Sequence, residues 1–139
     1  MNSKEENLRR MKHFETAINT NDVALAEELI DETAEFTTPV SPNKLHGGKG
    51  YMSVVSFMRQ SFSDVRWEMK DSVADENKVA VYWICSGTHD GDFMGLAPTG
   101  KKFSFSVMNF YYFNENGKIV NDIAAEGLIG LMRALGIAK

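Results

Sequence analysis

The chain has 139 residues, of which 43% are hydrophobic and 24% charged, a composition typical of globular proteins. This length predicts one domain, residues 1–139, whose core needs neither disulfides nor a metal ion. The net charge of −4 and the lack of a basic stripe argue against nucleic acid as a partner. Because residues 1–7 are polar and no apolar run reaches the ~18 residues of a membrane span, we expect a cytoplasmic protein without membrane contact.

Helical periodicity predicts three helices in the first half of the sequence. They are expected at residues 8–18, 25–30 and 51–62. Ser3 and Glu6 have the spacing of a capping box at the start of the first helix. Residues 33–38 are expected to be extended and to stop at Pro39. The glycine-rich residues 47–50 predict a flexible approach to the third helix.

From residue 65 the apolar positions recur at every second residue, which predicts strands. Four strands are expected, at residues 65–70, 79–89, 102–113 and 119–125. A hairpin turn is expected at residues 114–117, and a short helix at residues 128–135 closes the chain. Helices followed by hairpin-connected strands predict an α+β fold with an antiparallel sheet.

The strand expected at residues 79–89 is apolar on both faces near its centre, from Val81 to Ile84. Neither face of such a strand can be left in water. One face must pack on the helices, and the other needs a cover that the chain lacks, most simply a second copy of itself. The pattern therefore predicts a homodimer formed through the sheet.

Residues 87–101, Gly-Thr-His-Asp-Gly-Asp-Phe-Met-Gly-Leu-Ala-Pro-Thr-Gly-Lys, place His89 where a strand gives way to a glycine-rich connection. This segment resembles the signature of the SnoaL-like polyketide cyclase family, in the nuclear transport factor 2-like fold group. The resemblance covers nearly the whole chain. Its other parts are the segments 34–39, 62–67 (where Ser63 replaces the usual proline), 117–120 and 130–136.

The resemblance implies a cone-shaped, cystatin-like barrel, in which a curved antiparallel sheet and N-terminal helices enclose one mainly apolar pocket. Characterised cyclases of the family close a polyketide ring by intramolecular aldol condensation, with an acid–base aspartate and without metal or cofactor. It thus implies an acid–base enzyme acting on a small carbonyl compound, with no cofactor and no metal site. The alternative is a non-catalytic small-molecule-binding protein of the same fold that has lost the catalytic aspartate.

Two titratable residues are the catalytic candidates. His89 matches the histidine of the family's Gly-Thr-His pattern, and its alternative role is that of a hydrogen-bonded strand-end histidine. The family's last strand reads Glu-x-Trp-x-x-x-Asp, and the acid position holds Gly127. Glu126, one residue earlier, is the candidate for a displaced acid. On a regular strand it would face away from the pocket. Its alternative role is to cap the last helix. The expected pocket residues are Trp83, Asn109, Tyr111, Phe36 and Ile123.

Asn109 is a polar residue among the apolar Phe105, Val107 and Tyr111, and a buried amide needs a hydrogen-bond partner. The sequence leaves open whether this partner is a ligand or a neighbouring backbone group. A third hypothesis is a relative of the epoxide hydrolases or ketosteroid isomerases of the same fold group. It requires aspartates in the pocket, and the sequence shows no such set.

Overall fold

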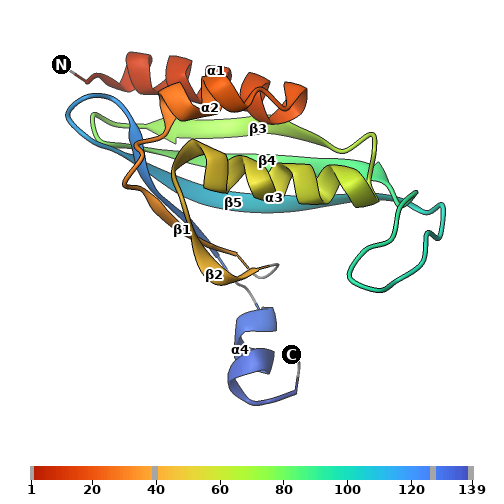
Figure 1. Ribbon diagram of the computed structural model, residues 1–139. Coiled ribbons are helices and arrows are strands. Elements are labelled where there is room, and N and C mark those ends of the chain that lie inside the picture. The colour runs from red at the N-terminus through yellow and green to blue at the C-terminus, as the bar shows by residue number, and fades with distance from the viewer. Residues whose placement is uncertain (1, 39–40, 126–127, 138–139) are drawn as a thin grey trace.

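The computed structural model describes residues 2–38, 41–125 and 128–137, in which helices cover one side of an antiparallel sheet (Figure 1). Three helices precede the main sheet and one follows it: α1 (Lys4–Thr20), α2 (Val23–Leu29), α3 (Gly47–Ser61) and α4 (Leu128–Ala134). The hairpin between α2 and α3 consists of β1 (Glu35–Thr38) and β2 (Ser41–His46). The main sheet has the strand order β3 (Arg66–Ala74), β4 (Lys78–Thr88), β5 (Lys102–Phe113) and β6 (Ile119–Ala124).

The predicted α+β class is confirmed, because helices come first and neighbouring strands of the main sheet run antiparallel. The sheet is open: β3 and β6 are edge strands in the part of the chain that the structure describes, and they do not pair into a closed barrel. Figure 1 shows α1 and α3 lying across the same face of the sheet, while β1 contacts β6. The main core lies between these helices and the sheet.

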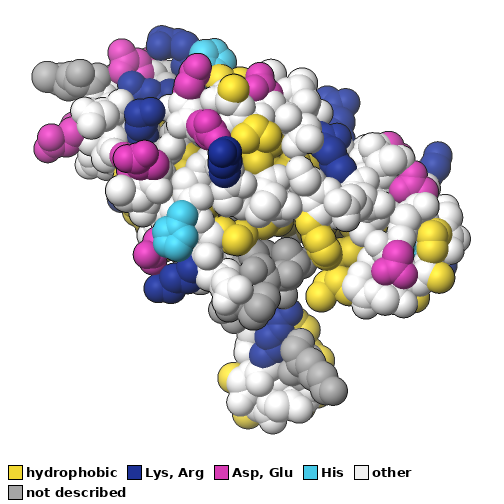
Figure 2. Space-filling view, in the orientation of Figure 1, with side chains coloured by type: hydrophobic (Ala, Val, Ile, Leu, Met, Phe, Trp, Pro, Cys, Tyr) yellow, Lys and Arg dark blue, Asp and Glu magenta, His cyan; other side chains and the backbone are white. Residues whose placement is uncertain are grey.

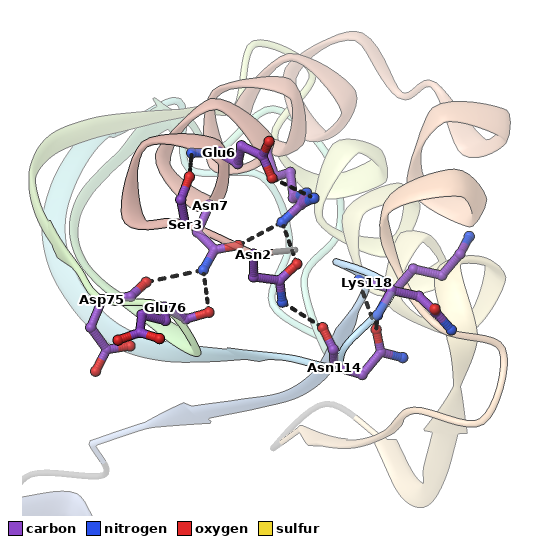
Figure 3. A network of polar contacts seen from close by, with 10 residues as sticks. Asn2, Ser3, Glu6, Asn7, Asp75, Glu76, Asn114 and Lys118 are labelled. Atoms are coloured by element: carbon purple, nitrogen blue, oxygen red, sulfur yellow. Dashed lines mark hydrogen bonds and ion pairs between the residues drawn. The ribbon is translucent and has the colours of Figure 1, made fainter.

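The N-terminal end of α1 is tied to the sheet by polar side chains (Figure 3). Ser3 caps the helix as predicted, since its Oγ accepts a hydrogen bond from the backbone N–H of Glu6 at 3.2 Å. Asn7 is fully buried, and its Nδ2 donates to the carbonyl oxygens of Asp75 and Glu76, at 3.0 Å each. A buried amide that meets two carbonyls in this way holds α1 against the turn between β3 and β4.

The first turn of α3 lies where the sequence predicted a flexible approach, so that expectation is wrong. Gly47 has a φ of 64°, a left-handed conformation that glycine adopts without a steric penalty. A Cβ added at Gly48 would lie 2.6 Å from the backbone nitrogen of Glu27 in α2. The glycines therefore allow the two helices to approach closely instead of loosening the chain.

The face of the sheet that the helices do not cover is apolar and exposed. Pairing places Tyr82 beside Met108 and Ile123 beside Phe110, so these four side chains share this outer face. Met108 is 61% exposed and Ile123 51%. The homodimer through this face stays a prediction.

The helix α4 stands apart from the body of the molecule in Figure 1. None of its described residues is buried, and Leu128 is 71% exposed. Figure 2 shows hydrophobic side chains on the surface of α4 and along the adjoining edge of the body. The position of this short helix, residues 128–134, agrees with the helix expected at residues 128–135.

Candidate active site

A cavity of about 1220 Å³ lies against the inner face of the sheet. Its lining residues come from α1, α3, the β1–β2 hairpin, all four strands of the main sheet and α4, and most of them are apolar. On the hairpin side it is bordered by the exposed ion pair of Lys44 with Glu35, whose nitrogen and oxygen are 3.3 Å apart. The cavity thus combines an apolar wall with a charged, solvent-exposed rim, the arrangement of a small-molecule site.

The carboxyl group of Asp122 lies in this wall and is the main candidate for acid–base chemistry in the cavity. Asp122 pairs with Tyr111 across β6 and β5, on the inner face of the sheet. Its Oδ1 accepts a hydrogen bond of 2.7 Å from Nδ2 of Asn109. Burial raises the pKa of Asp122 from 3.8 to about 6, while the nearby side chains of Asn109 and Tyr51 act in the opposite direction.

Two tyrosines and a tryptophan lie beside Asp122 in the wall of the cavity. The indole Nε1 of Trp83 donates to the hydroxyl of Tyr111 at 2.9 Å. Burial raises the pKa of both Tyr51 and Tyr111 well above the ordinary value, with the charge of Asp122 acting in the same direction. Both hydroxyls therefore stay protonated near neutral pH.

The strands bring these groups together because alternate residues share a face. Trp83 of β4 pairs with Val107 of β5, and Asn109 and Tyr111 follow on the same side. Tyr51 comes from α3 on the opposite wall. Its ring packs edge-on against Phe36, with 5.3 Å between the ring centroids.

The residues expected to form the pocket all border the cavity: Trp83, Asn109, Tyr111, Phe36 and Ile123. Ile123 borders the cavity, pairs with Phe110 on β5 and is 51% exposed. The sequence left open whether the amide of Asn109 bonds to a ligand or to a backbone group. In the structure its partner is the side chain of Asp122.

His89 lies elsewhere in the structure and is not among the residues that line the cavity. It stands six positions beyond Trp83, a distance of about 20 Å along an extended strand. Its ring is 6% exposed and packs against Phe62, with 5.7 Å between the ring centroids. The Nδ1 atom accepts a hydrogen bond from the backbone N–H of Thr99 at 3.3 Å. The Nε2 atom is buried and has no hydrogen-bond partner among the described residues.

Glu126 and Gly127, the other positions on which the sequence argument depended, lie outside the described residues. Asp122 was missed because of a β-bulge. Counting alternate residues from the buried Ile119 turns Asn121 and Ile123 inward, but the register of β6 shifts by one residue after Ile119. The shift turns Asp122 inward instead. The one signal in the sequence was the need of Asn109 for a polar partner.

Within residues 2–38, 41–125 and 128–137, no three histidine, cysteine, aspartate or glutamate side chains lie close enough together to hold a metal ion. None of the helices in those ranges has both the length and the apolar character required to cross a membrane.

The fold agrees with a comparison to known protein families. Residues 8–135 match the family described as SnoaL-like polyketide cyclase. The chain belongs to this family. No curated protein matches the sequence.

Solved structures with the same fold include several from Streptomyces. TsrD from Streptomyces laurentii has a TM-score of 0.74 at 21% identity, covering 94% of each chain. IdmH from Streptomyces antibioticus, described as a putative polyketide cyclase, has a TM-score of 0.73 at 24% identity, covering 94% of this chain and 98% of its own. A putative SnoaL-like polyketide cyclase from Jannaschia sp. CCS1 has a TM-score of 0.76 at 13% identity, covering 98% and 95%. At these identities the likeness shows a common fold.

Proposed function

We propose that the chain is a cofactor-independent acid–base enzyme of the cyclase type, acting on a small, largely apolar carbonyl compound held in the cavity. The observation that carries the proposal is the carboxyl group of Asp122, which lies in the apolar wall with a pKa of about 6. A base with a pKa close to the working pH is suited to proton transfer in both directions. At pH 7 about ten copies of Asp122 are ionised for each protonated one.

The reaction needs only proton transfers and one new carbon–carbon bond. The Asp122 carboxylate removes a proton from a carbon next to a carbonyl group, which leaves an enolate. The enolate carbon attacks a second carbonyl of the same molecule, and the ring closes with a negative charge on the attacked oxygen. Asp122 then returns its proton to that oxygen, so that the enzyme is regenerated. The cavity wall contributes by holding the two reacting ends of a flexible molecule together.

This assignment differs from the sequence hypotheses in the residue it uses. We assign no step to His89, which lies outside the cavity lining. The alternative of a non-catalytic binding protein rests on the loss of the family's aspartate, and Asp122 supplies a carboxyl group from another position on β6. Binding without catalysis is the second candidate, and the following experiment separates the two.

Proton removal can be followed without knowledge of the natural substrate. The protein is incubated in D2O with a small aromatic β-diketone, and deuterium uptake at the central carbon is measured by NMR. We expect uptake above the buffer rate in the unmodified protein, and a loss of ~10²–10⁴-fold in Asp122→Asn. Asp92→Asn, in the exposed loop after β4, is the matched control and should exchange like the unmodified protein. Equal uptake in Asp122→Asn would refute the role of Asp122, and saturable binding without uptake would favour the binding protein.

We also propose that this protein works as a homodimer formed through the outer face of the sheet. The support is the exposed apolar set on β4, β5 and β6 around Phe110, which no other described part of the chain covers. Light scattering should give the mass of a dimer for the unmodified protein and for Leu96→Lys, which changes an exposed loop residue. Phe110→Lys should give a monomer. A monomeric unmodified protein, or a dimeric Phe110→Lys variant, would contradict the proposal.

A further inference from the structure

Three polar atoms in the wall of the cavity have no hydrogen-bond partner within residues 2–38, 41–125 and 128–137. They are the hydroxyl of Tyr51, Oδ2 of Asp122 and Oδ1 of Asn109. None of the three is among the fully buried polar atoms that lack a partner, so each has access to the space of the cavity. Polar groups in an apolar wall are satisfied by water or by a bound molecule, so these atoms are the points at which a ligand can be held.

The two oxygens of the Asp122 carboxyl group differ in their surroundings. Oδ1 accepts the hydrogen bond of 2.7 Å from the amide of Asn109, which holds the carboxyl group in place. Oδ2 keeps its lone pairs open to the cavity. It is therefore the oxygen that can take up a proton from a bound molecule.

Tyr51 offers the complementary group, a hydroxyl that keeps its proton. Its ring is packed edge-on against both Phe14 and Phe36, with 5.1 and 5.3 Å between the ring centroids. Burial raises the pKa of Tyr51, and the nearby charge of Asp122 acts in the same direction. The hydroxyl of Tyr111, in contrast, already accepts a hydrogen bond from Trp83, and this residue is only 1% exposed. Tyr51 is thus the tyrosine whose hydroxyl can donate to a bound molecule.

We propose that Tyr51 is a second catalytic residue, whose hydroxyl donates a hydrogen bond to the carbonyl oxygen of the substrate while Oδ2 of Asp122 removes a proton from the neighbouring carbon. The inference rests on the proposed role of Asp122 as the base. The C–H bond breaks, its proton moves to Oδ2, and its electron pair forms the C=C bond of an enolate whose oxygen carries the negative charge. Tyr51 keeps its proton, and its hydrogen bond strengthens as the charge develops. The matching substrate class is an enolisable ketone or aldehyde, whose acidic carbon and carbonyl oxygen reach both groups at once.

The test is deuterium uptake from the aromatic β-diketone in Tyr51→Phe, which loses one oxygen and keeps its ring. The rates are compared at pH 8, where Asp122 is ionised, so that a change in its pKa does not account for a loss. We expect kcat to fall by ~10²–10³-fold with little change in KM, because the hydrogen bond is stronger to the enolate than to the ketone. Tyr112→Phe is the matched control, since Tyr112 is not among the residues that line the cavity, and it should exchange like the unmodified protein. A kcat in Tyr51→Phe equal to that of the control, or a loss confined to KM, would overturn the role of Tyr51.

Two measurements on the ligand-free protein separate this role from a structural one. The urea midpoint of Tyr51→Phe should equal or exceed that of the unmodified protein, because the hydroxyl has no hydrogen bond to lose in this state. The titration of Asp122, followed by NMR of its ¹³C-labelled carboxyl carbon, should persist in Tyr51→Phe, which shows that the base is intact. A clearly lower midpoint would contradict the open hydroxyl on which the proposal depends. Normal uptake in Tyr51→Phe with a loss in Asp122→Asn would reject Tyr51 alone, whereas unchanged uptake in Asp122→Asn would reject the proposed function itself.

Discussion

Replacing Asp122 with asparagine should make the unfolding free energy of the protein less dependent on pH. As the pH rises, the variant should become more stable relative to the unmodified protein. Burial raises the pKa of Asp122 from 3.8 to about 6 in the folded state. The folded protein therefore binds this proton more tightly than the unfolded chain does. The resulting stabilisation is complete below pH 4 and is lost as the pH rises through 6.

The size of the effect follows from the two pKa values. The rise from 3.8 to about 6 is about two units, and each unit corresponds to about 1.4 kcal/mol, which gives about 3 kcal/mol. Between pH 4 and pH 8, the difference in unfolding free energy between the unmodified protein and Asp122→Asn should change by about 2.4 kcal/mol in favour of the variant, because the carboxyl group of the unfolded chain is still partly ionised at pH 4. A difference in packing or hydrogen bonding between the neutral carboxyl group and the amide adds a constant that does not depend on pH.

Urea unfolding at pH 4, 5, 6, 7 and 8 measures this change directly. Asp64→Asn is the control for the sign, because the hydroxyl and backbone N–H of Thr88 hold the pKa of Asp64 below its ordinary value. The stability that Asp64 contributes should therefore be lost as the pH falls, the opposite of Asp122. A constant difference between Asp122→Asn and the unmodified protein across this range would refute a raised pKa and, with it, the burial of a charged carboxylate.

Three further variants test other parts of the account. Asn7→Ala leaves two carbonyl oxygens of the β3–β4 turn without their donor and should lower the unfolding free energy by about 2–4 kcal/mol, measured by urea unfolding. Gly48→Ala places a Cβ 2.6 Å from the backbone nitrogen of Glu27 and should lower the thermal midpoint. His89→Gln should leave both the deuterium uptake and the titration of Asp122 unchanged, and a loss of uptake comparable to that in Asp122→Asn would restore His89 to the active site.

The sequence predicted well wherever a regular repeat decides the structure. The alternation of residues 102–113 put Asn109 and Tyr111 on one face, and the structure has both on the cavity lining. A regular strand leaves its residues no other choice of face. The capping of α1 by Ser3 was predictable for a similar reason, because it depends on residues within one turn.

The sequence failed where pairing or packing between distant segments overrides the local pattern. The bulge after Ile119 follows from the register of β6 on β5, and it alone turns Asp122 into the cavity. The glycines at the start of α3 suggested a flexible segment, but they serve a close contact with α2 that no local pattern records. His89 carries a family motif at a strand end outside the cavity lining, so the motif predicted the fold and not a residue of the cavity.

The central claim, that Asp122 is the base in the cavity, is tested most directly by the pH dependence of deuterium uptake from the β-diketone. The rate at low substrate concentration should rise through an inflection at pH about 6, the pKa of Asp122 in the free protein, and then level off. The same inflection should appear in the NMR titration of the Asp122 carboxyl carbon and disappear from the rate in Asp122→Asn. An inflection that persists in Asp122→Asn would contradict the account, because another group would then be removing the proton.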